Sequence, residues 1–152
     1  LFSSMLEKLL CLFLPCLPSV SPPSVSVTGI ATTYYKGDGF TPGKYFGCWE
    51  EAKRLLGTPK FRDDLPTVAM RSEHAKCGSV VRITHLKSGN RTLALVVDRG
   101  PFGCRWKNGS RSVEPSGGCI PQGGKRIALI DLSPVIAKEL GSSGFDKVTV
   151  SW

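Results

Sequence analysis

The sequence predicts a mostly β domain, a small barrel with one crossover helix, and three observations lead to this fold class. Short runs of β-branched and aromatic residues recur along residues 28–152, separated by turn-forming residues. The chain contains 17 glycines and 11 prolines, which favours short strands and many turns over a helical bundle. One well-capped helix precedes the last strand-like run. A chain of 152 residues is long enough for one such domain.

Residues 1–27 precede the predicted barrel as an apolar leader and a Pro/Ser-rich arm. Residues 5–17 read MLEKLLCLFLPCL, a charged pair followed by a short apolar run, and SMLE at its start matches a capping box. One interpretation is a retained apolar helix, in which residues 1–16 dock on a protein or a membrane. The other is a secretory signal peptide, because the run is too short for a transmembrane helix. Residues 17–27 (LPSVSPPSVSV) are predicted to form a linker or an extended arm.

The predicted barrel begins at Thr28, and its first half contains one strand and one helix. Residues 29–35 (GIATTYY) are predicted to form a strand, because β-branched and aromatic residues dominate the run. Residues 36–47 are expected to form a Gly-rich loop. Residues 49–56 (WEEAKRLL) have helical spacing, and residues 57–66 form a polar connection.

A hairpin lies at the centre of the predicted domain. Residues 79–86 (SVVRITHL) and 91–98 (RTLALVVD) are two strands joined by Lys-Ser-Gly-Asn, a favourable turn sequence. Residues 99–124 are expected to form a long Gly/Pro-rich loop, and residues 126–131 (RIALID) another strand.

The C-terminal part is predicted to contain the crossover helix and the last strand. Ser133 is the expected N-cap, Pro134 occupies the first helical position, and Gly141 ends the helix. Residues 146–151 (DKVTVS) alternate as a strand does.

The formal net charge of +8 lies entirely on the predicted domain, because Glu7 and Lys8 cancel within the leader. Such a surface suggests a polyanionic partner, either a nucleic acid or an anionic wall or membrane surface. A basic protein that is merely soluble is the plain alternative. The sequence contains no zinc-finger, helix-turn-helix or RNP-type pattern, so we predict no nucleic-acid partner.

Four of the six cysteines lie in loop-like or Gly-rich contexts, which suits disulfides in an oxidising compartment. The six are Cys11, Cys16, Cys48, Cys77, Cys104 and Cys119. The last four allow three pairings. We favour Cys104–Cys119, which would close a Gly-rich loop, and then Cys48–Cys77. Four reduced thiols are the alternative.

A metal or other cofactor is not expected. The sequence contains no CxxC pair, and its two histidines, His74 and His85, are isolated. We therefore predict neither a zinc site nor a cofactor.

Three segments together carry a family pattern. The first is GIATTYY at residues 29–35, and the second, between residues 67 and 102, contains TVAM, CGSVVRIT and VVDRGPF. The third is RIALIDLS at residues 126–133, followed by the helix and VTV. Residues 28–152 thus resemble the double-psi β-barrel of the rare lipoprotein A family and, more distantly, the expansins.

This resemblance implies a six-stranded double-psi β-barrel whose groove binds glycan chains. Proteins like rare lipoprotein A are lytic transglycosylases that cleave peptidoglycan, whereas expansin-like proteins bind and loosen wall polysaccharide without clear hydrolysis. In both families the aspartate that matches Asp98 is the key polar residue of the groove. The resemblance also implies a secreted, periplasmic or wall-associated protein.

The chain departs from the family pattern in two places. The bacterial enzymes usually carry a histidine where this chain has Met70, and His74 is the candidate substitute. An insertion precedes Thr67, so the third polar residue of the family, an acid, corresponds to Asp63 or Asp64.

Asp98 is the candidate catalytic residue, because it ends the apolar run LALVV. A carboxyl group beside apolar surface favours its protonated form and can donate that proton, although Arg99 would oppose this. One acid suits a lytic transglycosylase, in which the 6-hydroxyl of the muramic sugar is the nucleophile, whereas ordinary hydrolysis needs two carboxylates. Asp131 is the candidate second acid and His74 a further catalytic candidate. The alternatives are a turn-capping Asp98, a structural Asp131 and a surface histidine.

Aromatic and basic side chains are the candidate glycan contacts. Tyr34 or Tyr35 could stack on a sugar ring, although alternation allows at most one of them to face the groove. Trp106 could stack in the same way or hold its loop in place. Arg71 and Arg99 could bind anionic wall components, and a solvated basic face is the alternative.

Three functions fit these patterns. The first is a lytic transglycosylase that acts on peptidoglycan, and the second is a non-catalytic wall-binding module of the expansin type. The third is a structural part of a virion or secretion machine that reuses the barrel. Met70 at the usual histidine position favours the second and third, and burial of Asp98 under the 99–124 loop would favour the third.

Overall fold

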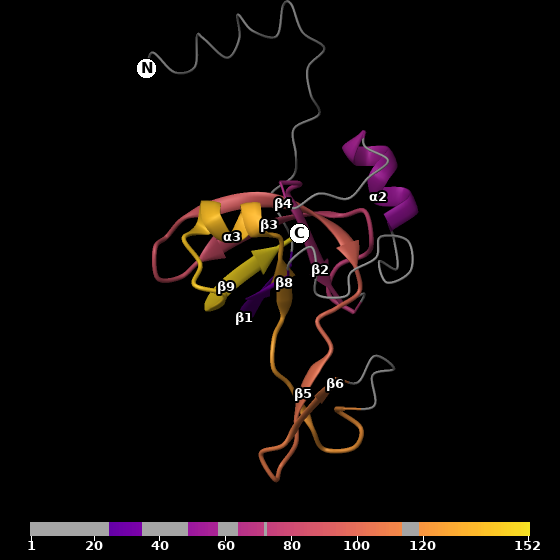
Figure 1. Cartoon of the computed structure of the whole chain (residues 1–152), viewed down its shortest axis with the longest axis vertical. Coiled ribbons are helices and arrows are strands. Elements are labelled where there is room, and N and C mark those ends of the chain that lie inside the picture. The colour runs from indigo at the N-terminus through magenta and orange to yellow at the C-terminus, as the bar shows by residue number, and fades with distance from the viewer. Residues whose placement is uncertain (1–24, 35–48, 58–63, 72, 114–118) are drawn as a thin grey trace, which may run out of the picture.

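The structure, a computed structural model, describes residues 25–34, 49–57, 64–71, 73–113 and 119–152 (Figure 1). It is mostly β, with a closed six-stranded barrel, a separate three-stranded sheet and two short helices. The predicted leader and the predicted Gly-rich loop lie outside the described residues, in 1–24 and 35–48. Within the described residues, no helix is long and apolar enough to cross a membrane.

Six strands close the barrel, and two of their six pairings are parallel. In spatial order the strands are β1 (Ser26–Thr33), β8 (Ile130–Leu132), β2 (Thr67–Met70), β4 (Arg91–Asp98), β3 (Val80–His85) and β9 (Phe145–Ser151). The pairs β1/β8 and β2/β4 are parallel, and the other pairs are antiparallel. The predicted hairpin of residues 79–98 is confirmed as β3 and β4.

The barrel interior is filled by the alternating apolar residues of these strands. Val81, Ile83 and Ile130, for example, are all 0% exposed. Because successive side chains on a strand point to opposite faces, the residues between them point outward. Helix α3 (Pro134–Leu140) adds Ile136 and Leu140 to the same core. Helix α2 (Trp49–Leu56), also predicted, contacts β4, and its Leu56 packs beside a smaller apolar cluster outside the barrel.

Helix α3 begins and ends where the sequence predicts, but Ser133 does not cap it through its side chain. The Ser133 hydroxyl donates to the carbonyl of Leu65 at 2.9 Å instead. Gly141 ends the helix in the left-handed conformation, with φ 69°, as a C-terminal glycine commonly does. Ser133 therefore joins the helix start to the segment before β2.

The chain between β4 and β8 forms a second sheet, where the sequence predicted a loop over 99–124 and a strand over 126–131. Its strands are β5 (Gly103–Arg105), β6 (Arg111–Val113) and β7 (Lys125–Arg126), in the order β6–β5–β7. The predicted strand is divided, because residues 125–126 pair with β5 whereas β8 pairs within the barrel. We call residues 103–126, as far as they are described, the lobe. Figure 1 shows β5 and β6 projecting away from the barrel.

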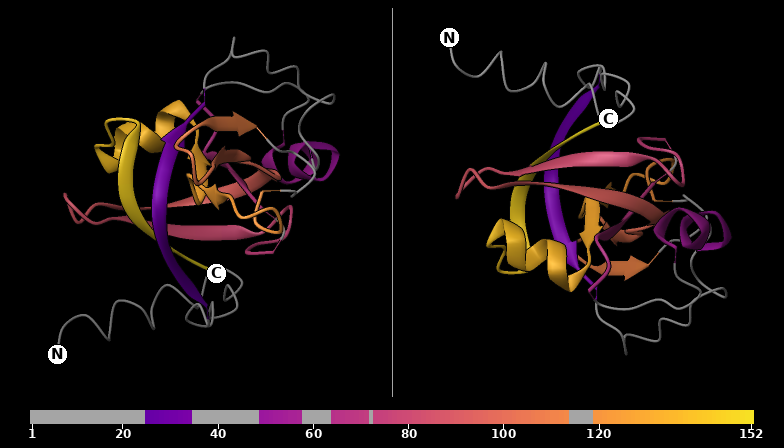
Figure 2. Two further views of the ribbon diagram at one scale, coloured as in Figure 1. Left: turned by 90° about the horizontal axis from the view of Figure 1, so that it is seen from below. Right: turned by 90° about the horizontal axis from the view of Figure 1, so that it is seen from above.

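The barrel begins two residues earlier than the predicted boundary at Thr28. Strand β1 pairs with β9 as far as Ser26, opposite Ser151. Beyond it, the backbones of Val25 and Trp152 exchange hydrogen bonds of 3.3 and 3.1 Å. Residues 26 and 27 therefore belong to the barrel, and Figure 2 shows β1 and β9 side by side.

Candidate functional site

A row of residues on the outer face of the barrel brings the two predicted acids together. Asp98 on β4 lies in register with Ala69 on β2, and Ala69 lies in register with Asp131 on β8. Asp131 is in turn in register with Thr32 on β1. Residues in register on paired strands point to the same side of a sheet, so the two aspartates flank Ala69 on one face.

A β-bulge places Asp98 in this row. Val68 pairs with Val96 inside the barrel, but Ala69 then pairs with Asp98, so the register shifts by one residue between the two strands. Simple alternation from the buried Val96 would have turned Asp98 toward the interior. Bulges redirect side chains in this way and are common next to functional sites.

The carboxyl group of Asp98 is held close to its own backbone and is largely covered. Its Oδ1 accepts a 2.7 Å hydrogen bond from the backbone N–H of Arg99. Asp98 is 9% exposed. Gly100, two residues after Asp98, lies over Ala69, since a Cβ on Gly100 would be 3.9 Å from the Ala69 Cβ. We expected Asp98 to lie at the surface of an open groove. In the structure this side chain is instead largely covered, and the chain just after β4 lies beside it.

Asp131 is the more accessible of the two acids. It is partly exposed, between the buried residues Ile130 and Leu132. With neighbouring strands roughly 5 Å apart, the Cα atoms of Asp98 and Asp131 are roughly 10 Å apart across Ala69. The Oδ1 atom of Asp131 is nevertheless buried, so both carboxyl groups of the row are at least partly covered.

Arg71, predicted as a surface contact for anions, instead joins the two segments that connect the lobe to the barrel. It is 8% exposed, and its Nη1 donates to the carbonyl oxygens of Pro101 at 3.1 Å and Ala128 at 3.0 Å. Pro101 follows β4 and Ala128 precedes β8, so one guanidinium group fixes both stems of the lobe. The sequence contained no signal for this role, because it depends on two distant carbonyl groups.

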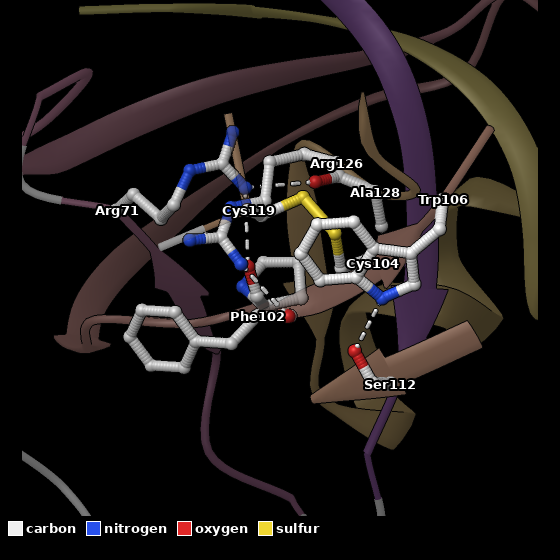
Figure 3. The surroundings of a disulfide bond; sticks show 9 residues. Arg71, Phe102, Cys104, Trp106, Ser112, Cys119, Arg126 and Ala128 are labelled. Carbon is white, nitrogen blue, oxygen red and sulfur yellow. Dashed lines mark hydrogen bonds between the residues drawn. A yellow bond between two sulfur atoms is a disulfide. The ribbon is translucent and has the colours of Figure 1, made fainter. Parts of the chain in front are cut away.

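A second arginine joins the same stems. Arg126 donates from Nη1 to the carbonyl of Phe102 at 2.8 Å, and its guanidinium lies 5.7 Å from the centre of the Phe102 ring. Figure 3 shows Arg126 and Arg71 near the disulfide between Cys104 and Cys119. Together the two arginines hold Pro101 and Phe102, shortly after Asp98.

His74 belongs to this network as a neutral acceptor. Its Nε2 lies 3.3 Å from Nη2 of Arg71, and a guanidinium can only donate, so Nε2 accepts and carries no proton. Burial, and then the charge of Arg71, lowers the pKa of His74 below its usual 6.5. Met70, where the resemblance implies a histidine, is 0% exposed and part of the core. His74 therefore contacts the site through Arg71, and its ring also packs edge-on against Trp152.

The other predicted contacts are dispersed. Tyr34 is 2% exposed and its hydroxyl bonds with that of Thr67, so its ring is covered and not open to a sugar. Arg99 is exposed beside Asp98, and Asp64 is exposed before β2. Trp106 lies on the lobe, where its Nε1 donates to the Ser112 hydroxyl at 2.9 Å (Figure 3). Tyr35 and Asp63 lie outside the described residues.

The predicted disulfide between Cys104 and Cys119 is present. Their Cα atoms are 6.1 Å apart, and both side chains are fully buried beneath the lobe sheet. Cys77 is also disulfide-bonded, and Cys48, its predicted partner, lies outside the described residues. In the part of the chain that the structure describes, no three His, Cys, Asp or Glu side chains gather as a metal site would require.

The chain matches no protein-family model and shows no significant similarity to a curated protein. The resemblance to rare lipoprotein A and the expansins therefore rests on the motifs in the sequence.

Proposed function

We propose that the chain is a glycan-acting, secreted, periplasmic or wall-associated protein, a lytic transglycosylase whose general acid and base is Asp98. The observation that carries this proposal is the row in which Asp98 and Asp131 flank Ala69 on one outer face. Two acids from distant parts of the chain meet there through a bulge, which a purely structural barrel does not require.

The double-psi topology is the fold that we propose for the barrel. A six-stranded barrel with two parallel pairs, β1/β8 and β2/β4, among antiparallel pairs supports it. In this arrangement the ends of β2 and β4 lie side by side, which is where the motif residues of the family occur. A location outside the cytoplasm is supported by the buried Cys104–Cys119 disulfide.

In the proposed reaction Asp98 first donates its proton to the glycosidic oxygen while the bond from C1 to that oxygen breaks. The 6-hydroxyl of the muramic sugar then attacks C1 and gives its proton to Asp98, which returns to its starting state. The products are a free 4-hydroxyl and a 1,6-anhydro sugar, and no water is consumed. Asp131, on the same face, would stabilise the positive charge that develops at C1.

Asp98 must become accessible before it can act. Because Gly100 lies over the neighbouring Ala69, a glycan chain would have to displace Arg99 and Gly100. Arg71 and Arg126 would meanwhile hold the carbonyl groups of Pro101 and Phe102. Arg71 is therefore a positioning residue in the proposal, and not a group that touches the substrate.

The low exposure of Asp98 favours a second candidate, a structural barrel in a virion or secretion machine. In that case the hydrogen bond from the Arg99 N–H to Asp98 would only stabilise the turn after β4. An expansin-like module, which binds wall glycan without cleaving it, lies between the two candidates.

The experiment is to incubate the whole chain with peptidoglycan and to search for anhydro-muropeptides by mass spectrometry. Wild-type protein should release them, and Asp98→Asn should abolish their release while it preserves the shape of the side chain. Glu139→Gln, which removes an exposed acid on α3 outside the row, is the control and should remain active.

Each negative result has a distinct meaning. Reducing ends without anhydro sugars would indicate a hydrolase that uses both carboxylates. Binding without cleavage would favour the expansin-like reading. Absence of both binding and cleavage would favour the structural candidate.

A further inference from the structure

Three cations lie side by side across the lobe sheet. Arg105 on β5 is in register with Arg111 on β6 and with Lys125 on β7. Partners in register have Cβ atoms about 5 Å apart on the same face, where like charges destabilise a sheet. All three side chains are exposed. In the described part of the lobe no carboxylate side chain lies near enough to balance them, because residues 103–113 and 119–126 contain no Asp or Glu.

Two of these cations, Arg105 and Lys125, line two hollows in the surface. One of about 310 Å³ is bounded by Arg105 and Lys125, together with the apolar side chains of Ile30, Ile127 and Phe145. The other, of about 350 Å³, is bounded by Arg105, Lys107, Lys125 and Trp106. Because Arg105 and Lys125 border both hollows, the two lie next to each other at the cation row.

We propose that this row is a binding site for an anionic glycan, a sugar polymer that carries carboxylate or phosphate groups. The anions would lie between Arg111, Arg105 and Lys125, where they would relieve the repulsion among the three cations. Phe145, which is 57% exposed, and the indole of Trp106 offer apolar faces on which sugar rings can pack.

The choice of a glycan over other polyanions rests on the proposed function, because the lobe begins five residues after Asp98. Its two stems are joined by Arg71 beside the acid row, so a polymer held on the lobe would reach the barrel face. The lobe would retain the wall polymer, and the row of acids would act on a neighbouring part of it.

The test uses the whole chain and three polymers: polygalacturonate, neutral pullulan and a single-stranded oligodeoxythymidine. Wild-type protein should bind polygalacturonate in preference to the other two, and binding should weaken steeply as salt is added. The triple variant R105Q/R111Q/K125Q should lose at least about tenfold in affinity.

The matched control is R82Q/K87Q/R91Q, which removes three exposed cations from β3, its turn and β4. It should bind within about threefold of wild type, because the net charge changes equally but the row remains. The lobe variant should also melt no lower than wild type, since the substitutions remove repulsion. If the triple variant fails to fold, the single variant R105Q, which removes only the central cation of the row, should still bind polygalacturonate more weakly than wild type.

Equal loss in the two variants would overturn the site, because binding would then follow net charge alone. Tighter binding of pullulan would overturn the anionic requirement, and tighter binding of the oligonucleotide would assign the row to nucleic acid. These failures are distinct from failure of the proposed function, which is read from anhydro-muropeptides and not from binding.

Discussion

The barrel and the lobe are built from one continuous chain but are stabilised in different ways. The barrel buries a contiguous cluster of aliphatic side chains, whereas among the described lobe residues only Cys104, Cys119 and Gly124 are buried. Val113 and Ile120 of the lobe are 70% and 60% exposed. A sheet with so little core needs covalent and polar links, and the disulfide and the arginine-bound stems provide them. The barrel, which has the apolar core, thus carries the acids, and the lobe, which depends on these links, carries the cations.

The largest effect should come from a cavity in the barrel. Ile130→Ala removes a side chain that is 0% exposed on β8, beside Asp131, and should lower the free energy of unfolding by about 2–5 kcal/mol. Urea denaturation measures it. The control Leu93→Ala, at a side chain that is 55% exposed, should change stability by about 0.5 kcal/mol or less. Similar effects at both positions would contradict a single apolar core.

Removal of the disulfide should destabilise the lobe and leave the stability of the barrel unchanged. In C104S/C119S the loop of 15 residues loses a constraint of about 3 kcal/mol, but the loss should be confined to the lobe. Hydrogen exchange should accelerate in β5, β6 and β7 and remain slow in β3 and β4. If the barrel strands also exchange faster, the lobe is part of the barrel's cooperative unit.

Substitution of Arg71 tests whether the two stems couple the lobe to the barrel. Arg71→Ala leaves the buried carbonyl group of Ala128 and that of Pro101 without this donor and should cost about 2–3 kcal/mol. Arg71→Lys should recover only part of the loss, because a single ammonium group cannot reproduce the planar fork of the guanidinium. Thermal melting measures the loss, and full recovery by lysine would show that charge alone matters.

Gly124 offers a finer test inside the lobe. A Cβ at this position would lie 2.6 Å from Sγ of Cys104 and 2.8 Å from Sγ of Cys119, so the disulfide would have to move. Gly124→Ala should therefore destabilise the lobe by about 1–3 kcal/mol. At Gly103 the nearest contact would be an ordinary 3.6 Å to Ile127, so Gly103→Ala is the control. Proteolysis by trypsin, which cleaves after the lobe's cations, distinguishes the two variants.

The smallest effect concerns the pH dependence of stability at Asp146 on β9. Hydrogen bonds, chiefly from the Ser142 hydroxyl, lower the pKa of Asp146 from 3.8 to about 2. Because the folded pKa lies below the unfolded one, the carboxylate stabilises the fold above about pH 4, and this stabilisation is lost as the pH falls toward 2. Asp146→Asn should cost about 1 kcal/mol or less at pH 7 and flatten stability between pH 4 and 2. An unchanged acid profile would contradict this role.

The elements that the sequence predicted well are those with strong local signals. The hairpin of β3 and β4 has alternation and a turn sequence, and α3 has Pro134 and Gly141 at its ends. The lobe strands were missed because they contain two or three residues each and bury no apolar face, so no periodicity marks them. Residues 126–131 were predicted as one strand because their apolar run continues through the point where the chain passes from the lobe sheet to the barrel. No sequence signal marks that point.

The candidate site was predictable only in part. Asp98 and Asp131 were recognised from motifs, but their meeting across Ala69 depends on a bulge that the sequence does not encode locally. The burial of Tyr34 and Arg71 arises from contacts with Thr67, Pro101 and Ala128, which lie far along the chain. The cation row was hidden for the same reason, since its three members are brought together only by strand pairing.

The backbone pairing of Val25 with Trp152 has an architectural consequence. The chain therefore enters and leaves the barrel at neighbouring points. The two ends of the domain are separated by no more than the spacing of two paired strands. A barrel of this kind can be placed within a surface loop of a larger protein without separating the ends of that loop. It can also be circularly permuted, with new ends opened at the exposed turn of residues 87–90 between β3 and β4.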